Sequence, residues 1–463
     1  MRRAIAAAWA LWAALGAAGQ DITGNWSGTL NAPGIQVRIV IHISKVDTGY
    51  SAVMDSPDQG VNGIPVASTR FGQGRLTLEV AQPKVEYTGE WKDSLITGTF
   101  RQGGLSIPLE LRRAGATAKL VRPQEPTGPF PYTVEEVRFE NKGAGVTLAG
   151  TLTLPPGKGA FPAVVLITGS GPQNRDEEIF GHRSFLVIAD ALTRRGIAVL
   201  RYDDRGVGQS TGVFSKGTTA DFATDVEAAV AWLRTRKEIN PRRIGLLGHS
   251  EGGLIAPMVA AKDEKIRFIV LLAGPGMRGE EVSLSSQQLI AQAAGAWNKQ
   301  AQEMIDMNRG AMDIVVRDSL RMQHPDSLRV QLNAYFAQKA TEFPVLKENP
   351  AIVSRAIAEL SRPWTGYFLS YDPAPALEQV RCPVLALAGS KDVQVAPEDN
   401  LVAIGRALEK GGNRHLEVKE FPDLNHLFQE CKTGLPAEYG TIEQTFSPVA
   451  LEYLTNWVMK QAK

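Results

Sequence analysis

Cysteine is almost absent from this chain of 463 residues, which contains only Cys382 and Cys431. A framework of several disulfides is therefore excluded as the source of its stability. Even one bond is disfavoured, because Cys382 opens a predicted strand at one end of the expected sheet while Cys431 follows a loop at the other end. A disulfide tolerates a Cα separation of at most about 7 Å. We expect two free, mostly buried thiols.

An excess of charge is also lacking. The chain has 50 Lys and Arg against 49 Asp and Glu, a formal net charge of +1, and its basic residues form no stripe. Nucleic acid is therefore not an expected partner. The patterns His-Glu-x-x-His and clusters of Cys and His are missing, so we expect no metal and no cofactor. The loop Tyr202–Gly212 is rich in glycine but lacks the G-x-G-x-x-G spacing, and we interpret it as structural, with Asp203 or Asp204 paired to Arg205.

Apolar runs long enough to span a bilayer comfortably are missing too. The first 19 residues combine Arg2 and Arg3 with an apolar run over residues 4–15 and the small residues Ala17-Ala18-Gly19. This combination is typical of a secretory signal peptide. We predict a secreted or periplasmic protein without stable membrane insertion, and an uncleaved anchor is the alternative.

The length and the residue patterns predict two domains. The chain is too long for one ordinary core, and 43% hydrophobic with 21% charged residues is a globular composition. In residues 20–113, short segments alternate apolar and polar residues, as in 35–43 and 76–80, which predicts a small all-β domain. This domain would shape the substrate site, form a homodimer, or cover part of the second domain. Four prolines make residues 114–131 a semi-rigid linker.

Residues 132–463 alternate short apolar runs with longer helical patterns. This alternation predicts an α/β domain with a mostly parallel, doubly wound sheet. The later expected strands are 244–247, 268–272, 384–388 and 416–421, and the expected helices include 219–236, 252–262 and 397–410.

Residues 277–375 interrupt this alternation with helical periodicity and many Gln, Met and Ala residues. We expect a helical cap, because an insertion on the carboxyl side of the strands lies where open α/β sheets bind ligands. Aromatic and methionine side chains of the cap are candidates for an acyl pocket, although most such residues pack helices together. These candidates are Met304, Met307, Met312, Trp364, Tyr367 and Phe368.

The strongest motif is Gly248-His249-Ser250-Glu251-Gly252, between a short apolar run and an apolar helical pattern. Strand, sharp turn and helix in this order predict a nucleophile elbow that exposes Ser250. Side chains at positions 248 and 252 would collide with the backbone of so tight a turn. An ordinary turn between strand and helix is the alternative.

A serine nucleophile needs a base and an acid from the same edge of the sheet, and with an elbow of this kind the chain order is Ser, acid, His. Asp392 ends the turn after one buried run, and His426 follows the next run in the same way. We predict the triad Ser250, Asp392 and His426. The other carboxyl groups here, Glu398, Asp399 and Asp423, are weaker candidates. None of the remaining histidines follows the last strand: His42, His182, His249, His324 and His415.

The oxyanion that forms during acyl transfer needs two backbone N–H donors. One is expected from Glu251, immediately after the nucleophile. The other is expected from the loop Thr168-Gly-Ser-Gly-Pro, where Ser170 is our candidate and Gly169 and Gly171 are alternatives.

Five motifs of the second domain resemble those of bacterial secreted carboxylesterases of the α/β-hydrolase superfamily, which are related to the serine aminopeptidase-like hydrolases. They are Thr-Gly-Ser-Gly-Pro, Tyr-Asp-Asp-Arg-Gly-Val-Gly-Gln-Ser, Gly-His-Ser-Glu-Gly-Gly, Ala-Gly-Ser-Lys-Asp and Leu-Asn-His-Leu-Phe-Gln. The resemblance covers about 132–463 and implies the α/β-hydrolase fold with its triad. One departure is Thr168, which stands where many members have a histidine.

These observations favour a serine hydrolase that cleaves small-molecule carboxylic esters of short to medium acyl chains through an acyl-enzyme. A serine peptidase, aminopeptidase or amidase would use the same residues. Oligopeptidase action is disfavoured, since about ninety residues of β structure are too few for a large propeller. From a different class, a secreted binding protein on an inactive hydrolase scaffold is the remote alternative.

Overall fold

The computed structural model describes residues 21–32, 35–46, 49–56, 61–81, 84–92, 94–102, 104–114, 122–321 and 325–463. It divides the chain into two compact units, Met1–Lys119 and Leu120–Lys463. The predicted signal peptide lies outside the described residues, as do residues 115–121 of the predicted linker. Among the helices that the structure describes, none combines the length and the apolar character needed to cross a membrane.

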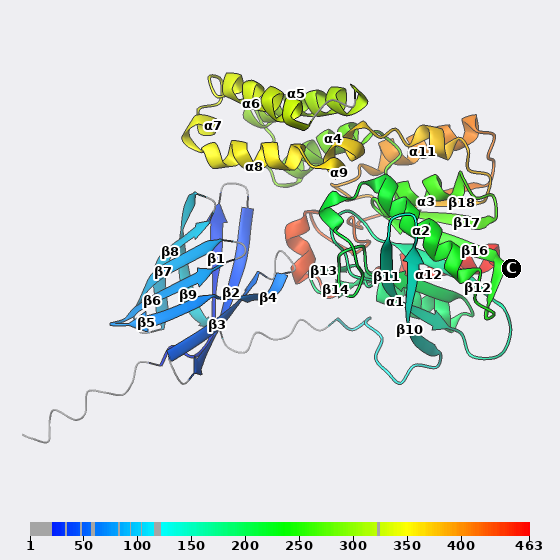
Figure 1. The fold of residues 1–463 in the computed structure, drawn as a ribbon, viewed down its shortest axis with the longest axis horizontal. Helices are drawn as coiled ribbons and strands as arrows, with labels where there is room; N and C mark the ends of the chain where they lie inside the picture. Colours follow the sequence, from blue (N-terminus) through cyan, green and yellow to red (C-terminus); the bar gives the residue numbers. More distant parts are fainter. Residues whose placement is uncertain are drawn as a thin grey trace, which may run out of the picture. The chain divides into compact units, whose positions relative to one another are not determined.

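The first unit is an antiparallel sheet with the strand order β4-β3-β2-β1-β9-β8-β7-β6-β5 (Figure 1). Alternate residues face its core, as in β6, where Leu76, Leu78 and Val80 are buried. Large side chains such as Trp26 and Tyr87 fill this core. The strands are β1 (Gly24–Ala32), β2 (Ile35–Val46), β3 (Gly49–Ser56), β4 (Val61–Pro65), β5 (Ser68–Gly72), β6 (Arg75–Val80), β7 (Val85–Lys92), β8 (Leu95–Gln102) and β9 (Leu105–Ala114).

The second unit is built on a mixed sheet with the order β10-β11-β15-β12-β16-β17-β18-β19. β11 pairs antiparallel with both β10 and β15, and the other pairs are parallel. Most of the sheet is therefore parallel, in keeping with the sequence pattern. The strands are β10 (Thr133–Asn141), β11 (Val146–Leu154), β12 (Phe161–Ile167), β15 (Ala198–Tyr202), β16 (Ile239–His249), β17 (Ile266–Leu272), β18 (Val384–Gly389) and β19 (Leu416–Phe421). A separate two-stranded ribbon joins β13 (Glu178–Ile179) to β14 (His182–Arg183).

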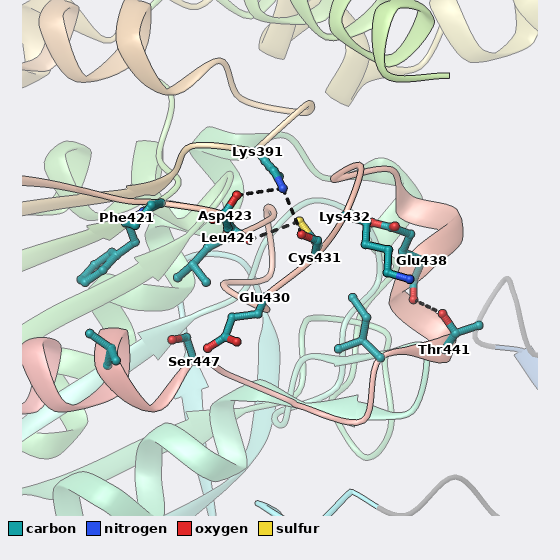
Figure 2. A pocket seen from close by; sticks show the side chains of 13 residues that line it. Lys391, Phe421, Asp423, Leu424, Glu430, Cys431, Lys432, Glu438, Thr441 and Ser447 are labelled. Carbon is teal, nitrogen blue, oxygen red and sulfur yellow. Dashed lines mark hydrogen bonds and ion pairs between the residues drawn. The ribbon is translucent and has the colours of Figure 1, made fainter. Parts of the chain in front are cut away.

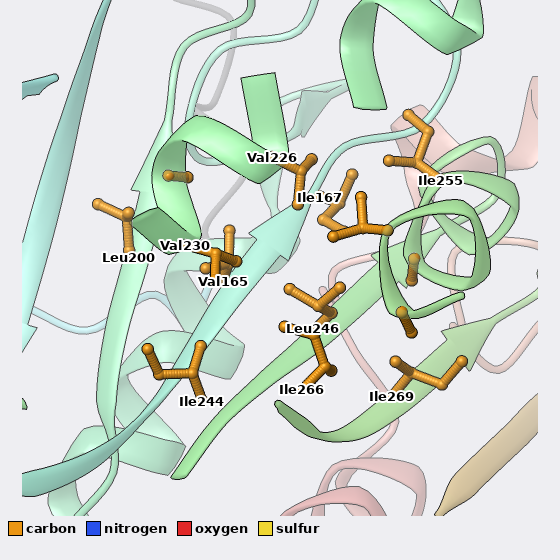
Figure 3. Close-up of a cluster of buried hydrophobic side chains, with 14 of the residues drawn as sticks. Val165, Ile167, Leu200, Val226, Val230, Ile244, Leu246, Ile255, Ile266 and Ile269 are labelled. Carbon is orange, nitrogen blue, oxygen red and sulfur yellow. The ribbon is translucent and has the colours of Figure 1, made fainter. Parts of the chain in front are cut away.

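Helices cover both faces of this sheet, which explains why its central strands are continuously apolar. In β12, Val165 and Ile167 belong to one buried cluster and Val164 and Leu166 to the other. Figure 3 shows the first cluster, to which α2 (Thr219–Leu233), α3 (Gly252–Ala260) and α11 (Pro397–Lys410) also contribute. The second cluster includes residues of α1 (Ser184–Arg194) and α12 (Pro448–Gln461).

A helical insertion separates β17 from β18, at the position predicted for the cap (Figure 1). It has a buried cluster of its own, which includes Val315, Leu332 and Phe336. The last helix, α10, instead contributes Leu377 to a cluster of the sheet. The helices are α4 (Gly279–Ala293), α5 (Lys299–Arg321), α6 (Pro325–Lys339), α7 (Pro344–Glu348), α8 (Pro350–Leu360), α9 (Pro363–Ser370) and α10 (Ala374–Leu377).

Both cysteines are free, as expected, but neither is fully buried. Cys382 and Cys431 each have intermediate exposure. Burial nevertheless raises the pKa of the Cys382 thiol to about 12 and that of Cys431 to about 11. Both thiols are therefore protonated and weakly nucleophilic at neutral pH.

We predict that Leu246→Ala destabilises the second unit by about 2–5 kcal/mol, because it removes buried methyl groups and leaves a cavity. Leu246 lies in the central strand β16 and is 0% exposed. Denaturant unfolding of the full chain measures the change. Val418→Ala on β19, where the side chain is 44% exposed, is the control and should shift stability by no more than about 0.5 kcal/mol. Equal effects of the two substitutions would contradict this account of the core.

Candidate active site

The turn after β16 has the strained geometry of a nucleophile elbow. Ser250 has a φ of 52°, in the left-handed region that side chains avoid. A Cβ at Gly248 would lie 1.9 Å from the carbonyl oxygen of Gly252, and one at Gly252 would lie 2.2 Å from the carbonyl oxygen of Ile167. No side chain fits at either glycine, so the sequence Gly-x-Ser-x-Gly is a steric requirement of this turn.

The structure brings Asp392 and His426 together at the ends of the neighbouring strands β18 and β19. His426 Nδ1 lies 2.7 Å from Asp392 Oδ2, and both residues are buried. Asp392 Oδ1 accepts the backbone N–H groups of Gln394 and Val395 at 2.8 and 2.9 Å. The carboxylate is thus fixed on both oxygens and orients the imidazole.

The alternative acids lie elsewhere. Asp423 is 69% exposed and forms an ion pair with Lys391, whose Nζ lies 2.8 Å from Asp423 Oδ1. Glu398 and Asp399 lie in the first turn of α11. None of the three is hydrogen-bonded to His426 in the structure, so Asp392 is the carboxylate that orients this imidazole.

No hydrogen bond joins the Ser250 hydroxyl to His426 in this structure. His249 connects their loops instead, because its Nε2 lies 2.9 Å from the carbonyl oxygen of His426. The rings of His249 and His426 are 4.8 Å apart between centroids. Catalytic hydrogen bonds are often long before substrate binds, so this geometry is compatible with a triad.

The loop after β12 packs directly against the elbow. A Cβ at Gly169 would lie 3.1 Å from Ser250 Cβ. The N–H of Gly169 already donates to Glu177 Oε1 at 2.8 Å, so it is not free to bind an oxyanion. Within the described residues, no acceptor is found for the N–H of Ser170 or of Glu251. These two donors, which the sequence favours, remain the candidates, and Gly171 remains the alternative to Ser170.

Each of the first three residues of this loop contacts a different buried carboxyl group. The Thr168 hydroxyl donates to Asp204 Oδ1 at 2.8 Å, and Gly169 donates to Glu177. Hydrogen bonds from Thr219 and Trp364, and an interaction with the Ser170 side chain, lower the pKa of Glu251 and partly oppose the effect of burial. The bonds to Asp204 and Glu177 therefore hold Thr168 and Gly169 of the candidate oxyanion loop.

Burial raises the pKa of two of these carboxyl groups, so they stay protonated to a higher pH than usual. It raises the pKa of Asp204 to about 8, against opposing hydrogen bonds from Gln173 and Thr168 and with further help from the charges of Glu251 and Glu177. Burial also raises the pKa of Glu251. Proton uptake limits the negative charge beside the candidate oxyanion loop.

Arg205 corrects one prediction, because it pairs with neither Asp203 nor Asp204. Its side chain reaches helix α2, where Nε lies 2.7 Å from Asp225 Oδ2. Asp203 instead faces Arg175, with 2.8 Å between Asp203 Oδ2 and Arg175 Nη2. Neighbouring residues in this tight loop point in different directions, so sequence adjacency does not identify the ion pairs.

The three aromatic candidates for the pocket all lie on α9 but differ in their contacts. Trp364 Nε1 donates to Glu251 Oε1 at 2.7 Å, which places this indole beside the elbow. Phe368 stacks on Trp364 and packs against the cap cluster, whereas Tyr367 stacks on Tyr371 and packs against a cluster of the sheet. The candidate methionines Met304, Met307 and Met312 pack in the cap cluster.

A cavity of about 990 Å³ is lined mainly by the loops that follow β18 and β19 (Figure 2). It is lined by Lys391, Asp423 and Cys431 among others, and by none of the triad residues. Within the described part of the chain, no group of three or more His, Cys, Asp or Glu side chains is arranged to hold a metal ion.

The fold and the elbow define this chain as an α/β-hydrolase. The sequence model of a family described as X-Pro dipeptidyl-peptidase (S15 family) matches residues 143–419, more than half of the chain. The chain belongs to this family.

Esterase EstD of Thermotoga maritima is 26% identical over 389 residues, which cover 82% of this chain and 83% of EstD. Thiohydrolase apmlB of Arthrinium phaeospermum is 29% identical over 35% of this chain and 52% of its own length. Among solved structures, an esterase of Pyrococcus furiosus is 16% identical, with a TM-score of 0.43 over 74% of this chain and 97% of that chain.

Glu177 and Asp204 are parts of the site that no sequence motif marks, and the motif around His249 indicates only an elbow residue. Glu177 lies eight positions after Gly169 and has a φ of 48°. No periodicity or spacing marks such a residue, since its role depends on a contact with His249, 72 positions away.

We predict that Gly248→Ala lowers hydrolytic activity at least about a hundredfold, because the new Cβ would overlap the Gly252 carbonyl and displace the elbow and its oxyanion donor. Steady-state kinetics on an ester substrate measures the loss. Gly405→Ala in α11 is the matched control, since its Cβ would lie 3.7 Å from Leu416 Cδ2 in ordinary contact. Retained activity in Gly248→Ala would contradict the steric requirement.

We predict that Asp204→Asn removes a pH dependence of stability. The folded pKa of about 8 lies above the ordinary 3.8. The stability that Asp204 contributes is therefore present below about pH 4 and is lost as the pH rises towards 8. The free energy of unfolding of the wild type, relative to Asp204→Asn, should fall over this range and then level off. Asp204→Ala removes the hydrogen bonds as well, so its stability should run parallel to that of Asp204→Asn but lower. A constant difference between wild type and Asp204→Asn would contradict the raised pKa.

Proposed function

We propose that this protein is a serine hydrolase that cleaves carboxylic esters of short to medium acyl chains, with Ser250, His426 and Asp392 as its triad. The observation that carries the proposal is the combination of a left-handed Ser250 in a glycine-flanked elbow with a buried His426–Asp392 pair at the same edge of the sheet. Nucleophile, base and orienting acid are then supplied in the chain order Ser, Asp, His.

In the proposed mechanism, His426 takes the proton of the Ser250 hydroxyl as its oxygen attacks the ester carbonyl carbon. The N–H groups of Glu251 and Ser170 donate to the oxyanion of the tetrahedral intermediate. When this intermediate collapses, the carbon–oxygen bond to the alcohol breaks and His426 returns its proton to the leaving alkoxide. Water then attacks the acyl-enzyme by the same steps and releases the acid and free Ser250.

Similarity to two known groups of proteins supports hydrolysis, but one suggests that the protein cleaves esters and the other that it cleaves peptide bonds. EstD, which aligns over most of both chains, is named an esterase. The family description names an X-Pro dipeptidyl-peptidase, and amide cleavage by the same three residues is therefore the second candidate. Export through the predicted signal peptide and a homodimer through the β unit also remain proposals.

We predict that the purified mature protein hydrolyses nitrophenyl esters of a chain-length series, and that Ser250→Ala abolishes this activity. X-Pro and aminoacyl nitroanilides measured in parallel should be cleaved far more slowly. Gly405→Ala serves as the control for substitution itself. Efficient anilide cleavage that also depends on Ser250 would make the protein a peptidase. Ester turnover that persists in Ser250→Ala would overturn the assignment of the nucleophile.

A further inference from the structure

A second buried dyad lies beneath the candidate triad. Glu177 Oε1 accepts the N–H of Gly169 at 2.8 Å and lies 2.9 Å from His249 Nδ1. On the other side of the ring, His249 Nε2 lies 2.9 Å from the backbone carbonyl oxygen of His426. Glu177 is 1% exposed and His249 is 4% exposed. A continuous chain of contacts thus runs from the oxyanion loop to the loop of the candidate base.

Proton counting constrains the state of this dyad. A carbonyl oxygen only accepts hydrogen bonds, so His249 Nε2 must carry a proton to bond His426. A neutral imidazole has one N–H, and its Nδ1 would then present a lone pair to the Glu177 carboxylate. The observed contacts on both nitrogens therefore require one further proton between Glu177 and His249. An imidazolium paired with a carboxylate satisfies every contact, including the bond from Gly169.

We propose that Glu177 and His249 are positioning residues that hold the oxyanion loop in register with His426 through this shared proton. The proposal rests on the proposed function, since it assigns these residues to the same reaction. Neither side chain forms or breaks a bond to the substrate. They fix the distance between the group that stabilises the oxyanion and the group that moves the proton.

The charges around His249 favour its protonated form. Burial by itself lowers the pKa of His249, but the Glu177 carboxylate and the His426 carbonyl outweigh burial, and Asp392 adds to their effect, so that the pKa is raised above 6.5. The His426 ring, 4.8 Å away, is the other titratable group facing it. The contacts of His249 with Glu177 and with the His426 carbonyl should all be present below pH 6.5. They should be lost as the pH rises through the raised pKa of His249.

The test uses two substitutions in the full chain. His249→Gln removes the titrating ring and Glu177→Gln keeps the shape of the acceptor but removes its charge. In Glu177→Gln, a neutral His249 has one proton for two acceptors, so one contact fails. We expect kcat for ester hydrolysis at pH 6.5 to fall about tenfold to a hundredfold in each, below the loss of an oxyanion donor itself, with little change in KM.

The pH dependence separates positioning from general damage. The ratio of wild-type kcat to that of His249→Gln should be largest near pH 6 and should decline towards one as the pH rises to 10. His182→Gln is the matched control. His182 is equally buried, and its two nitrogens lie 3.2 Å from Thr445 Oγ1 and 2.8 Å from the Tyr439 carbonyl oxygen. Burial lowers its pKa to about 4, so it stays neutral and its ratio should be flat.

A second readout does not depend on catalysis. The difference in melting temperature between wild type and His249→Gln should also shrink as the pH rises from 6 to 10. Flat kinetic ratios and a flat melting difference, in a protein that hydrolyses esters, would overturn the dyad while the proposed function stands. A shrinking melting difference in a protein that hydrolyses no ester would support the shared proton and reject the proposed function.

Discussion

The close approach of backbone segments around Ser250 is the constraint on which the rest of the site depends. The elbow brings the backbone at Gly252 so near to the end of β12 that a Cβ would lie 2.2 Å from the Ile167 carbonyl. This contact requires β12 and β16 to be neighbours, which they are in the sheet. The loop that follows β12 then lies against Ser250, since a Cβ at Gly169 would be 3.1 Å from Ser250 Cβ. The position of the candidate oxyanion loop is therefore a consequence of the elbow rather than an independent feature.

This packing places three carboxyl groups around the candidate oxyanion loop, which stabilises negative charge in the proposed mechanism. Ionised side chains there would oppose the oxyanion, since charges interact strongly where water is excluded. The negative charge of each carboxyl group is limited in its own way. Asp204 is protonated at neutral pH because burial raises its pKa to about 8. Glu177 faces His249, and burial raises the pKa of Glu251. Directional bonds to the loop are thus obtained with little net charge.

The sequence predicted what depends on local pattern and on strand order. The expected strand 416–421 and helix 397–410 have the bounds of β19 and α11. Alternation of Leu416 and Val418 with charged residues marks the strand, and a proline at the first helical position marks the helix. Asp392 and His426 could be paired because both follow adjacent parallel strands. The ion pairs of the loops could not be predicted. Arg205 bonds Asp225 and Glu177 bonds His249 across 20 and 72 positions, and such pairs depend on how irregular segments fold back, which has no period.

In the cap, too, the contacts of individual side chains could not be predicted from the sequence, as helix α9 shows. Trp364 and Phe368 lie one turn apart on α9, with rings stacked at 4.9 Å between centroids, and their composition does not distinguish them. Only the indole carries a donor, and a buried carboxylate beside the elbow satisfies it. The cap has a hydrophobic cluster of its own, so apolar packing within it does not fix its place over the sheet. The bond from Trp364 to Glu251 helps to fix it, together with Tyr367, which packs against a cluster of the sheet. Moving α9 would leave a buried carboxyl group without one of its donors, at a cost of about 1–3 kcal/mol. Helix α9 of the cap is therefore held in part through Glu251, the residue whose own N–H is the candidate oxyanion donor.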